Sequence, residues 1–263
     1  MGWWGKLIGG TFGFMIGGPL GAILGAALGH NFDRGLDGLP DMRLDQGQGH
    51  QQRIQTAFFT ATFSVMGHLC KADGLVSKDE IRVAREVMGQ MDLNPAQKKA
   101  AMALFNEGKK SGFPLDDVLM QLRREIGHRL TLKRMFIEIQ CLAACADDSV
   151  HSTEKKLLHH ICDVLGFSRY ELESLLVAIE TRYSHKHSQT GKPGGMVDAC
   201  KVLGIQPDAT EAEVKKAYRR LISQHHPDKL VSRGLPEEMM KLAAQRTHEI
   251  RQAYETIREQ KGW

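Results

Sequence analysis

The segment from Thr210 to Lys229 has the sequence TEAEVKKAYRRLISQHHPDK, and it decides the fold of the C-terminal part of the chain. Thr210 and Glu213 have the spacing of a capping box, in which two side chains satisfy free amides at the start of a helix. One face of this helix is apolar and consists of Val214, Ala217, Tyr218 and Leu221. Pro227 ends the helix, because proline fixes its own φ and disfavours helical backbone in the residue before it.

A helical hairpin is expected around this proline. A short helix from Val197 to Ile205 precedes the segment, and a long helix from about Glu237 to Ile257 follows it. The expected apolar positions of the long helix are Met240, Ala243, Ala244, Ile250, Ala253 and Tyr254. The sequence thus predicts an all-α unit over residues 196–263, with His226 and Asp228 at the tip of the hairpin.

The other face of the helix before the tip is basic. It carries Lys215, Lys216, Arg219 and Arg220. Such a patch can steer an acidic partner and fix its orientation. The alternative is a solvated face, since positive charges late in a helix that begins with Glu211 and Glu213 also complement the helix dipole.

Residues 196–263 resemble the J-domain family. The resemblance lies in a D-A-x-x-V-L-G opening, V-K-K-A-Y-R-R-L, H-P-D-K and Q-A-Y-E-T-I. It implies a module that docks on a DnaK-type chaperone and promotes its ATP hydrolysis, without bond chemistry or a cofactor of its own, so no enzyme is expected. The partner-binding residues that it implies are His226, Pro227, Asp228, Lys229, Lys215, Lys216, Arg219 and Arg220. The chain departs from the wider family because it has no four-cysteine zinc region.

The N-terminal residues 1–30 have the pattern of a membrane anchor. No charged residue occurs from Leu7 to Gly29, and a helix of this length would measure about 34 Å, enough to cross a hydrocarbon core. Trp3 and Trp4 suit the headgroup interface. A signal peptide is the rival interpretation, but its apolar core is shorter and ends in a small-x-small cleavage site. The charge distribution favours a cytoplasmic C-terminal side.

Glycine recurs at every fourth position of this anchor. The row consists of Gly9, Gly13, Gly17, Gly21, Gly25 and Gly29. In lipid this spacing allows two helix backbones to approach closely, and it predicts a homodimer through the anchor. The alternative is a glycine-tolerant anchor that packs against lipid alone.

Residues 50–182, between polar linkers at 31–49 and 183–195, show helical periodicity. Asp73 with Glu80 and Asp147 with Glu154 lie in two similar acidic turns, and this pair resembles the tellurite-resistance TerB-like helical domain. If the turns converge, their carboxylates are weak candidates for a divalent-cation site. The favoured interpretation is a helix cap used twice, with no metal.

Taken end to end, the chain resembles the DjlA family of bacterial inner-membrane, DnaJ-like co-chaperones. The resemblance implies an all-α, single-pass protein with a short periplasmic N-terminus and a cytoplasmic C-terminal bulk. A net charge of +4 gives no indication of nucleic-acid binding. The five cysteines are irregularly spaced, which indicates reduced core residues. The alternative function is a membrane scaffold, or a ligand- or metal-sensing adaptor, that acts through the TerB-like domain.

Overall fold

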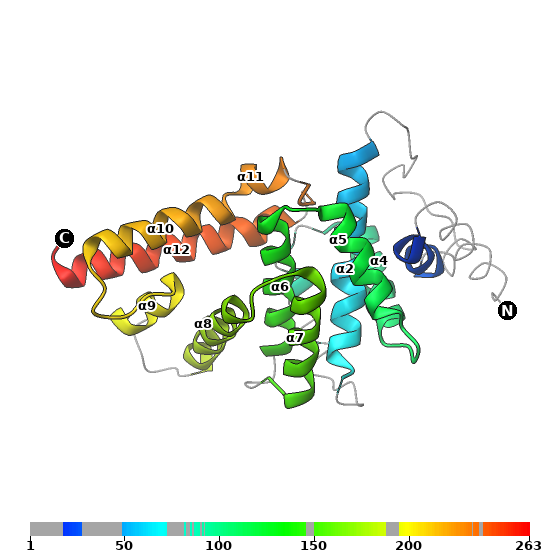
Figure 1. The fold of residues 1–263 in the computed structure, drawn as a ribbon, viewed down its shortest axis with the longest axis horizontal. Helices are drawn as coiled ribbons and strands as arrows, with labels where there is room; N and C mark the ends of the chain where they lie inside the picture. The colour runs from blue at the N-terminus through cyan, green and yellow to red at the C-terminus, as the bar shows by residue number, and fades with distance from the viewer. Residues whose placement is uncertain are drawn as a thin grey trace.

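The computed structural model describes residues 18–27, 49–72, 82, 85, 87–89, 91, 93–145, 150–187, 195–232, 234–236 and 239–263, with the backbone alone over 180–187. Every regular element in these ranges is a helix (Figure 1), so the predicted all-α fold class is confirmed. Two helical bodies lie side by side. The middle domain contains α2 to α8, and the C-terminal unit contains α9 to α12.

The middle domain is built around α2 (Gly49–Cys70). This helix contacts α4 (Pro95–Gly108), α5 (Leu115–Ile126), α6 (Leu130–Ala144) and α7 (Ser152–Leu165). Its C-terminal half is buried on nearly all sides, as expected of a helix at the centre of a bundle. The last helix of the domain, α8 (Arg169–His187), packs on α6 and α7. It continues five residues into the segment 183–195 that was expected to be a linker, because no glycine or proline occurs before Gly191.

Two glycines allow α2 and α4 to approach at backbone contact. A Cβ atom at Gly67 would lie 2.0 Å from the Phe105 carbonyl oxygen, and one at Gly108 would lie 1.8 Å from the Ser64 carbonyl oxygen. No residue with a side chain fits at either position without moving a helix. The start of α4 is fixed locally, because Asn94 and Gln97 form a capping box around Pro95, the first residue of the helix.

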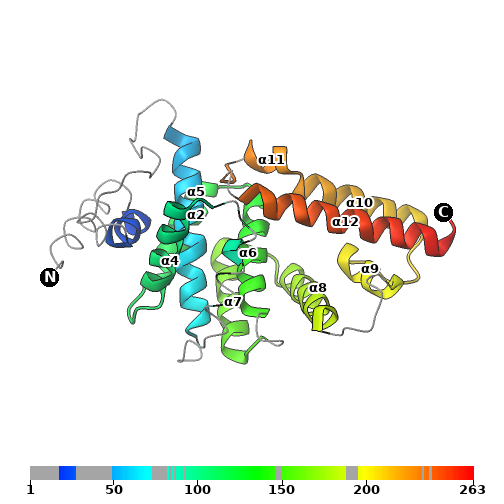
Figure 2. The same cartoon turned by 180° about the vertical axis from the view of Figure 1, so that it is seen from behind.

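The C-terminal unit is the predicted hairpin. Its helices are α9 (Met196–Leu203), α10 (Glu211–His225), α11 (Pro227–Val231) and α12 (Met240–Lys261). In Figures 1 and 2, α10 and α12 run antiparallel along each other, and Tyr218 stacks on Tyr254 between them with ring centroids 4.3 Å apart. The predicted capping box is present, since the Glu213 amide donates to the Thr210 hydroxyl and the Glu213 carboxylate accepts from the Thr210 amide.

The two ends of the hairpin belong to different hydrophobic cores. The far end has a small core of its own, formed by Ala199, Cys200, Leu203, Val214, Leu221, Ile250, Ala253 and Ile257. The near end, which carries α11, instead contributes Leu230, Leu235, Met239, Leu242 and Ala243 to the core of the middle domain. Of the predicted apolar positions in the long helix, Ala244 is exposed.

Part of the predicted anchor is described. Residues 18–27 form a helix against α5, where Leu20, Ile23 and Ala27 join the core and the Leu20 amide donates to Gln121 Oε1 at 2.8 Å. Within the described residues, no helix combines the length and the apolar character needed to cross a membrane. The rest of the predicted span, including Gly9, Gly13, Gly17 and Gly29, lies outside the described residues, as does the linker 31–49 except for its last residue.

Candidate functional site

The hairpin tip is a sharp break between two helices. The chain leaves α10 at His225 and adopts an extended backbone at His226, with φ −62° and ψ 122°. Pro227 then occupies the first position of α11, where its missing amide costs no hydrogen bond. The expectation that Pro227 ends the preceding helix is confirmed. The five-residue helix that it starts was not predicted.

The side chains of the tip are accessible. The Asp228 side chain is 85% exposed and that of His226 is 40% exposed, with 3.9 Å between the Asp228 Oδ2 and His226 Nδ1 atoms. Lys229 is also exposed, and its Nζ donates to the Ser223 hydroxyl at 3.0 Å. An imidazole, a carboxylate and an ammonium group are therefore presented together at the end of α10.

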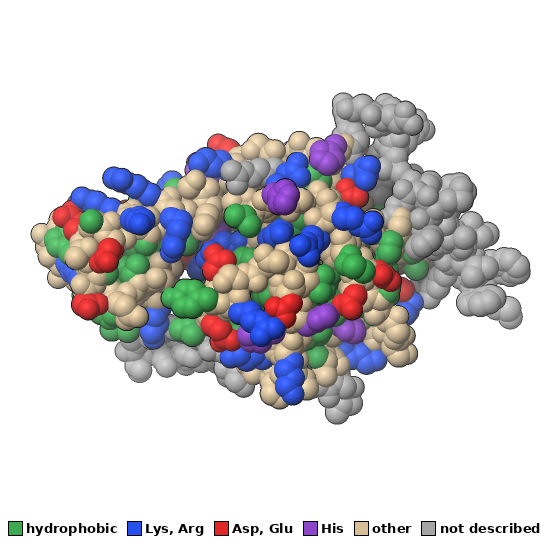
Figure 3. Space-filling model, in the orientation of Figure 1, with side chains coloured by type: hydrophobic (Ala, Val, Ile, Leu, Met, Phe, Trp, Pro, Cys, Tyr) green, Lys and Arg blue, Asp and Glu red, His purple; other side chains and the backbone are tan. Residues whose placement is uncertain are grey.

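The basic face is also in the predicted place. Lys216, Arg219 and Arg220 are exposed on α10, while Lys215 is half-buried and pairs with Glu211. In Figure 3 lysine and arginine side chains gather at the upper left, over the position of α10 in Figure 1. The outer face of α10 and the tip thus form one continuous surface that suits an acidic partner.

A buried threonine of α12 contacts the end of α10 at the base of the tip. The Thr247 hydroxyl lies 2.9 Å from the carbonyl oxygens of both His225 and Ala243, and it can donate to one of them at a time. His225 is buried, and burial lowers the pKa of its imidazole from 6.5 to about 4, so the ring is neutral at pH 7. The neutral His225 ring lies beside the buried Glu138 carboxylate and directly before the half-buried His226.

The sequence analysis did not predict the buried ion pair that lies beside His225. Glu138 of α6 and Arg246 of α12 are both buried, with 2.8 Å between Oε1 and Nε. Two signals pointed to it. Glu138 interrupts an apolar run from Phe136 to Ile139, and Arg246 lies between Ala243 and Ile250 on the apolar face of α12.

The acidic turns are described only in part. Asp73, Glu80 and Asp147 lie outside the described residues. Glu154 is buried and accepts a hydrogen bond from the His151 amide at 3.0 Å, which is the role of a helix-capping carboxylate. Within the described ranges, no group of three or more potential metal ligands comes together.

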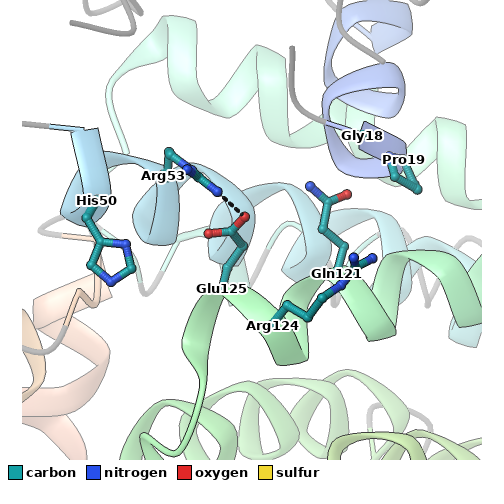
Figure 4. Close-up of a pocket in the computed structure, with 7 residues that line it drawn as sticks. All are labelled: Gly18, Pro19, His50, Arg53, Gln121, Arg124 and Glu125. Carbon is teal, nitrogen blue, oxygen red and sulfur yellow. Dashed lines mark hydrogen bonds and ion pairs between the residues drawn. The ribbon is translucent and has the colours of Figure 1, made fainter. Parts of the chain in front are cut away.

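A cavity of about 490 Å³ opens where the helix of residues 18–27 meets α2 and α5 (Figure 4). It is lined by Gly18, Pro19, His50, Arg53, Gln121, Arg124 and Glu125. The Arg53 and Glu125 side chains pair across its wall at 2.9 Å. These seven residues contain no nucleophile next to a base, so the cavity does not have the groups of a hydrolytic site.

Comparison with known proteins agrees with this arrangement. Residues 1–39 match the co-chaperone DjlA transmembrane domain, residues 59–176 match the tellurite resistance protein TerB, and residues 198–262 match the DnaJ domain. The Co-chaperone protein DjlA of Coxiella burnetii is 44% identical over 98% of both chains, and that of Vibrio cholerae is 42% identical over 98% of both. The chain belongs to the DjlA family.

DjlA membership accounts for the three parts of the chain. The hairpin with the His226-Pro227-Asp228 turn is the J-domain of a DjlA-type co-chaperone. The TerB match covers α4 to α7 with parts of α2 and α8, and the apolar N-terminus matches the DjlA transmembrane domain. No solved structure matches the chain.

Proposed function

We propose that this DjlA-family protein stimulates the ATPase of a DnaK-type chaperone through the His226-Pro227-Asp228 turn and the basic face of α10. The observation that carries the proposal is the exposed tip at the end of a basic helix, with Asp228 85% exposed. The cations steer and orient the acidic partner, and the tip then meets the surface through which the partner's ATPase responds. The protein regulates hydrolysis and does not itself break a bond.

The proposed arrangement in the membrane follows from the same function. In the membrane-inserted protein, the helix of residues 18–27 leaves its position against α5 and joins the rest of the anchor, residues 1–30, in the bacterial inner membrane. Residues 50–263 lie on the cytoplasmic side, where ATP and a DnaK-type chaperone are available. Proteolysis of sealed inverted and right-side-out vesicles tests this orientation. Cleavage of the J-domain only from the periplasmic side would contradict the proposal.

We also propose that the anchor forms a homodimer through its glycine row. Simultaneous replacement of Gly13, Gly17 and Gly21 by isoleucine should abolish self-association in a membrane dimerisation assay, because the bulky side chains keep the helices apart. Gly10→Ile, off the row, is the matched control and should leave self-association intact. Equal self-association in the triple variant and the control would refute the glycine interface.

The decisive experiment measures the ATPase rate of a DnaK-type chaperone in the presence of the full chain. His226→Gln should remove the stimulation. His248→Gln changes another exposed histidine of the J-domain, on α12, and should stimulate like the unaltered protein. If His226→Gln stimulates as well as the unaltered protein, the turn is not the working element and the proposal fails.

A further inference from the structure

The J-domain contacts the middle domain at two places, through α9, which packs on α8, and through its tip end. Leu230, Leu235 and Met239 are fully buried there, in the core that the middle domain provides. The loop after α11 lies directly against α2, since a Cβ atom at Gly234 would be 2.7 Å from Ile54 Cγ2. Next to this contact, Gln51 Nε2 donates to the Val231 carbonyl oxygen at 3.1 Å.

An ion pair lies at the same interface. The Glu138 and Arg246 side chains are only 4% and 7% exposed, and they join α6 of the middle domain to α12 of the J-domain. Arg246 also pairs with Glu249 at 3.0 Å. Burial alone lowers the pKa of the Arg246 guanidinium, but Glu138 and Glu249 outweigh it, so the pKa is raised and the cation persists.

The pair also reaches the residue before the exposed tip. Glu138 Oε2 is 3.8 Å from His225 Nδ1, and neither ring nitrogen of His225 has a hydrogen-bond partner among the described residues. On the α6 side, Arg134 pairs with Glu171 of α8 at 3.4 Å. The end of α10 therefore lies beside charged side chains that belong to the middle domain.

Seating on the middle domain does not cover the surface that meets the partner. Asp228 is 85% exposed and His226 is 40% exposed in this position. Lys216, Arg219 and Arg220 are exposed as well. The Asp228 carboxylate and these three cations are therefore open to solvent while the J-domain is docked, and the His226 ring is partly open with its Nδ1 atom buried.

We propose that Glu138 and Arg246 form a latch that holds the J-domain on the middle domain, and that the J-domain acts on its partner from this docked position. The second half of this proposal rests on the proposed function. Glu138 is then a positioning residue. It lies in the TerB-like domain and touches no partner, yet it fixes the direction in which the His226-Pro227-Asp228 turn points.

The latch itself is tested by amide hydrogen exchange of the full chain in detergent micelles, without any partner. Glu138→Gln removes the carboxylate that the middle domain provides to Arg246, leaves only Glu249 of α12 itself, and favours undocking. Exchange in α6 and in residues 227–243 should then become at least about tenfold faster, which corresponds to ~1.4 kcal/mol. Glu125→Gln, which alters a carboxylate paired with Arg53 on another surface, is the matched control. Unchanged exchange in Glu138→Gln would overturn the latch.

Action from the docked position is tested by repeating the exchange measurement with a DnaK-type chaperone and ATP. Exchange in α6 should remain as slow as in the free protein. Faster exchange in α6 would show that the partner releases the J-domain, and it would overturn this half of the proposal.

The half-maximal concentration and the maximal rate of ATPase stimulation, measured separately, distinguish a positioning role of Glu138 from a general loss of structure. Glu138→Gln should raise the concentration that gives half-maximal ATPase stimulation by about tenfold, equivalent to ~1.4 kcal/mol, while the maximal rate stays the same. An unchanged half-maximal concentration would refute the positioning role. If even the unaltered protein stimulates no better than His226→Gln, the proposed function fails, while exchange without a partner still decides the latch.

Discussion

Replacement of Gly67 by alanine tests the close crossing of α2 and α4. The added Cβ would lie 2.0 Å from the Phe105 carbonyl oxygen and 2.8 Å from its carbon, whereas ordinary contacts begin at 3.4 Å. The obstacle is helix backbone, so it cannot rotate aside as a flexible side chain would. The two helices must separate by more than 1 Å, and the core around them loses contacts.

Two opposing effects determine how Gly67→Ala changes the free energy of unfolding. Overpacking of a close-packed core costs about 1–3 kcal/mol, and more where backbone must move. Alanine recovers about 1 kcal/mol, because glycine is the poorer helix former. We therefore expect Gly67→Ala to lower the free energy of unfolding by roughly 2 kcal/mol.

Urea denaturation of the full chain in detergent micelles, followed by far-UV circular dichroism, measures this change. Gly89→Ala is the control, since Gly89 is helical and exposed, with nothing within 4 Å of an added Cβ. It should raise the free energy of unfolding by about 0.5–1 kcal/mol. If Gly67→Ala is as stable as Gly89→Ala, the helices are not in backbone contact and the reasoning is wrong.

Three further predictions concern the J-domain. The pKa of His225 is about 4 in the folded protein and 6.5 in the unfolded chain, so the stabilisation by the neutral ring is complete above pH 6.5 and is lost as the pH falls to 4. In urea denaturation, the free energy of unfolding should fall by about 3 kcal/mol over this pH range, and His225→Gln should lack this loss. Arg219→Glu should weaken binding of a DnaK-type chaperone in a salt-dependent manner, while the control Arg251→Glu on α12 should not. If both variants bind the chaperone equally well, the basic face of α10 does not steer the partner. Thr210→Ala removes a helix cap and should lower the free energy of unfolding by about 1 kcal/mol, whereas Thr210→Ser should not; equal denaturation midpoints would contradict the cap.

Much of the fold was predictable because its signals are local. The capping boxes at Asn94 and Thr210, the helical periodicity and the break at Pro227 each depend on residues within one or two turns. The exposed turn and the basic face of α10 follow from the same short segment. These are interactions between neighbours in sequence, which propensity and spacing describe well.

The docking of the J-domain was not predictable for the opposite reason. Glu138 and Arg246 are 108 positions apart in the chain, and each resembles an isolated charge on an otherwise apolar face. Leu230, Leu235 and Met239 lie around a loop and have no helical period, so nothing indicated that they share a core. The helix α11 was missed because Pro227 was interpreted only as the end of one helix, although proline is also favoured at the first position of the next.

Because the core of the hairpin is divided, the J-domain that sequence similarity defines is not the unit that folds cooperatively. A J-domain fragment that begins at residue 196 would keep the core of its far end. It would expose a hydrophobic patch to water, which consists of Leu230, Leu235, Met239 and Leu242. Such a fragment would fray at the end that carries its signature tripeptide and would tend to self-associate. In the whole protein, the tip end of the J-domain unfolds together with the middle domain, because the two share one hydrophobic core.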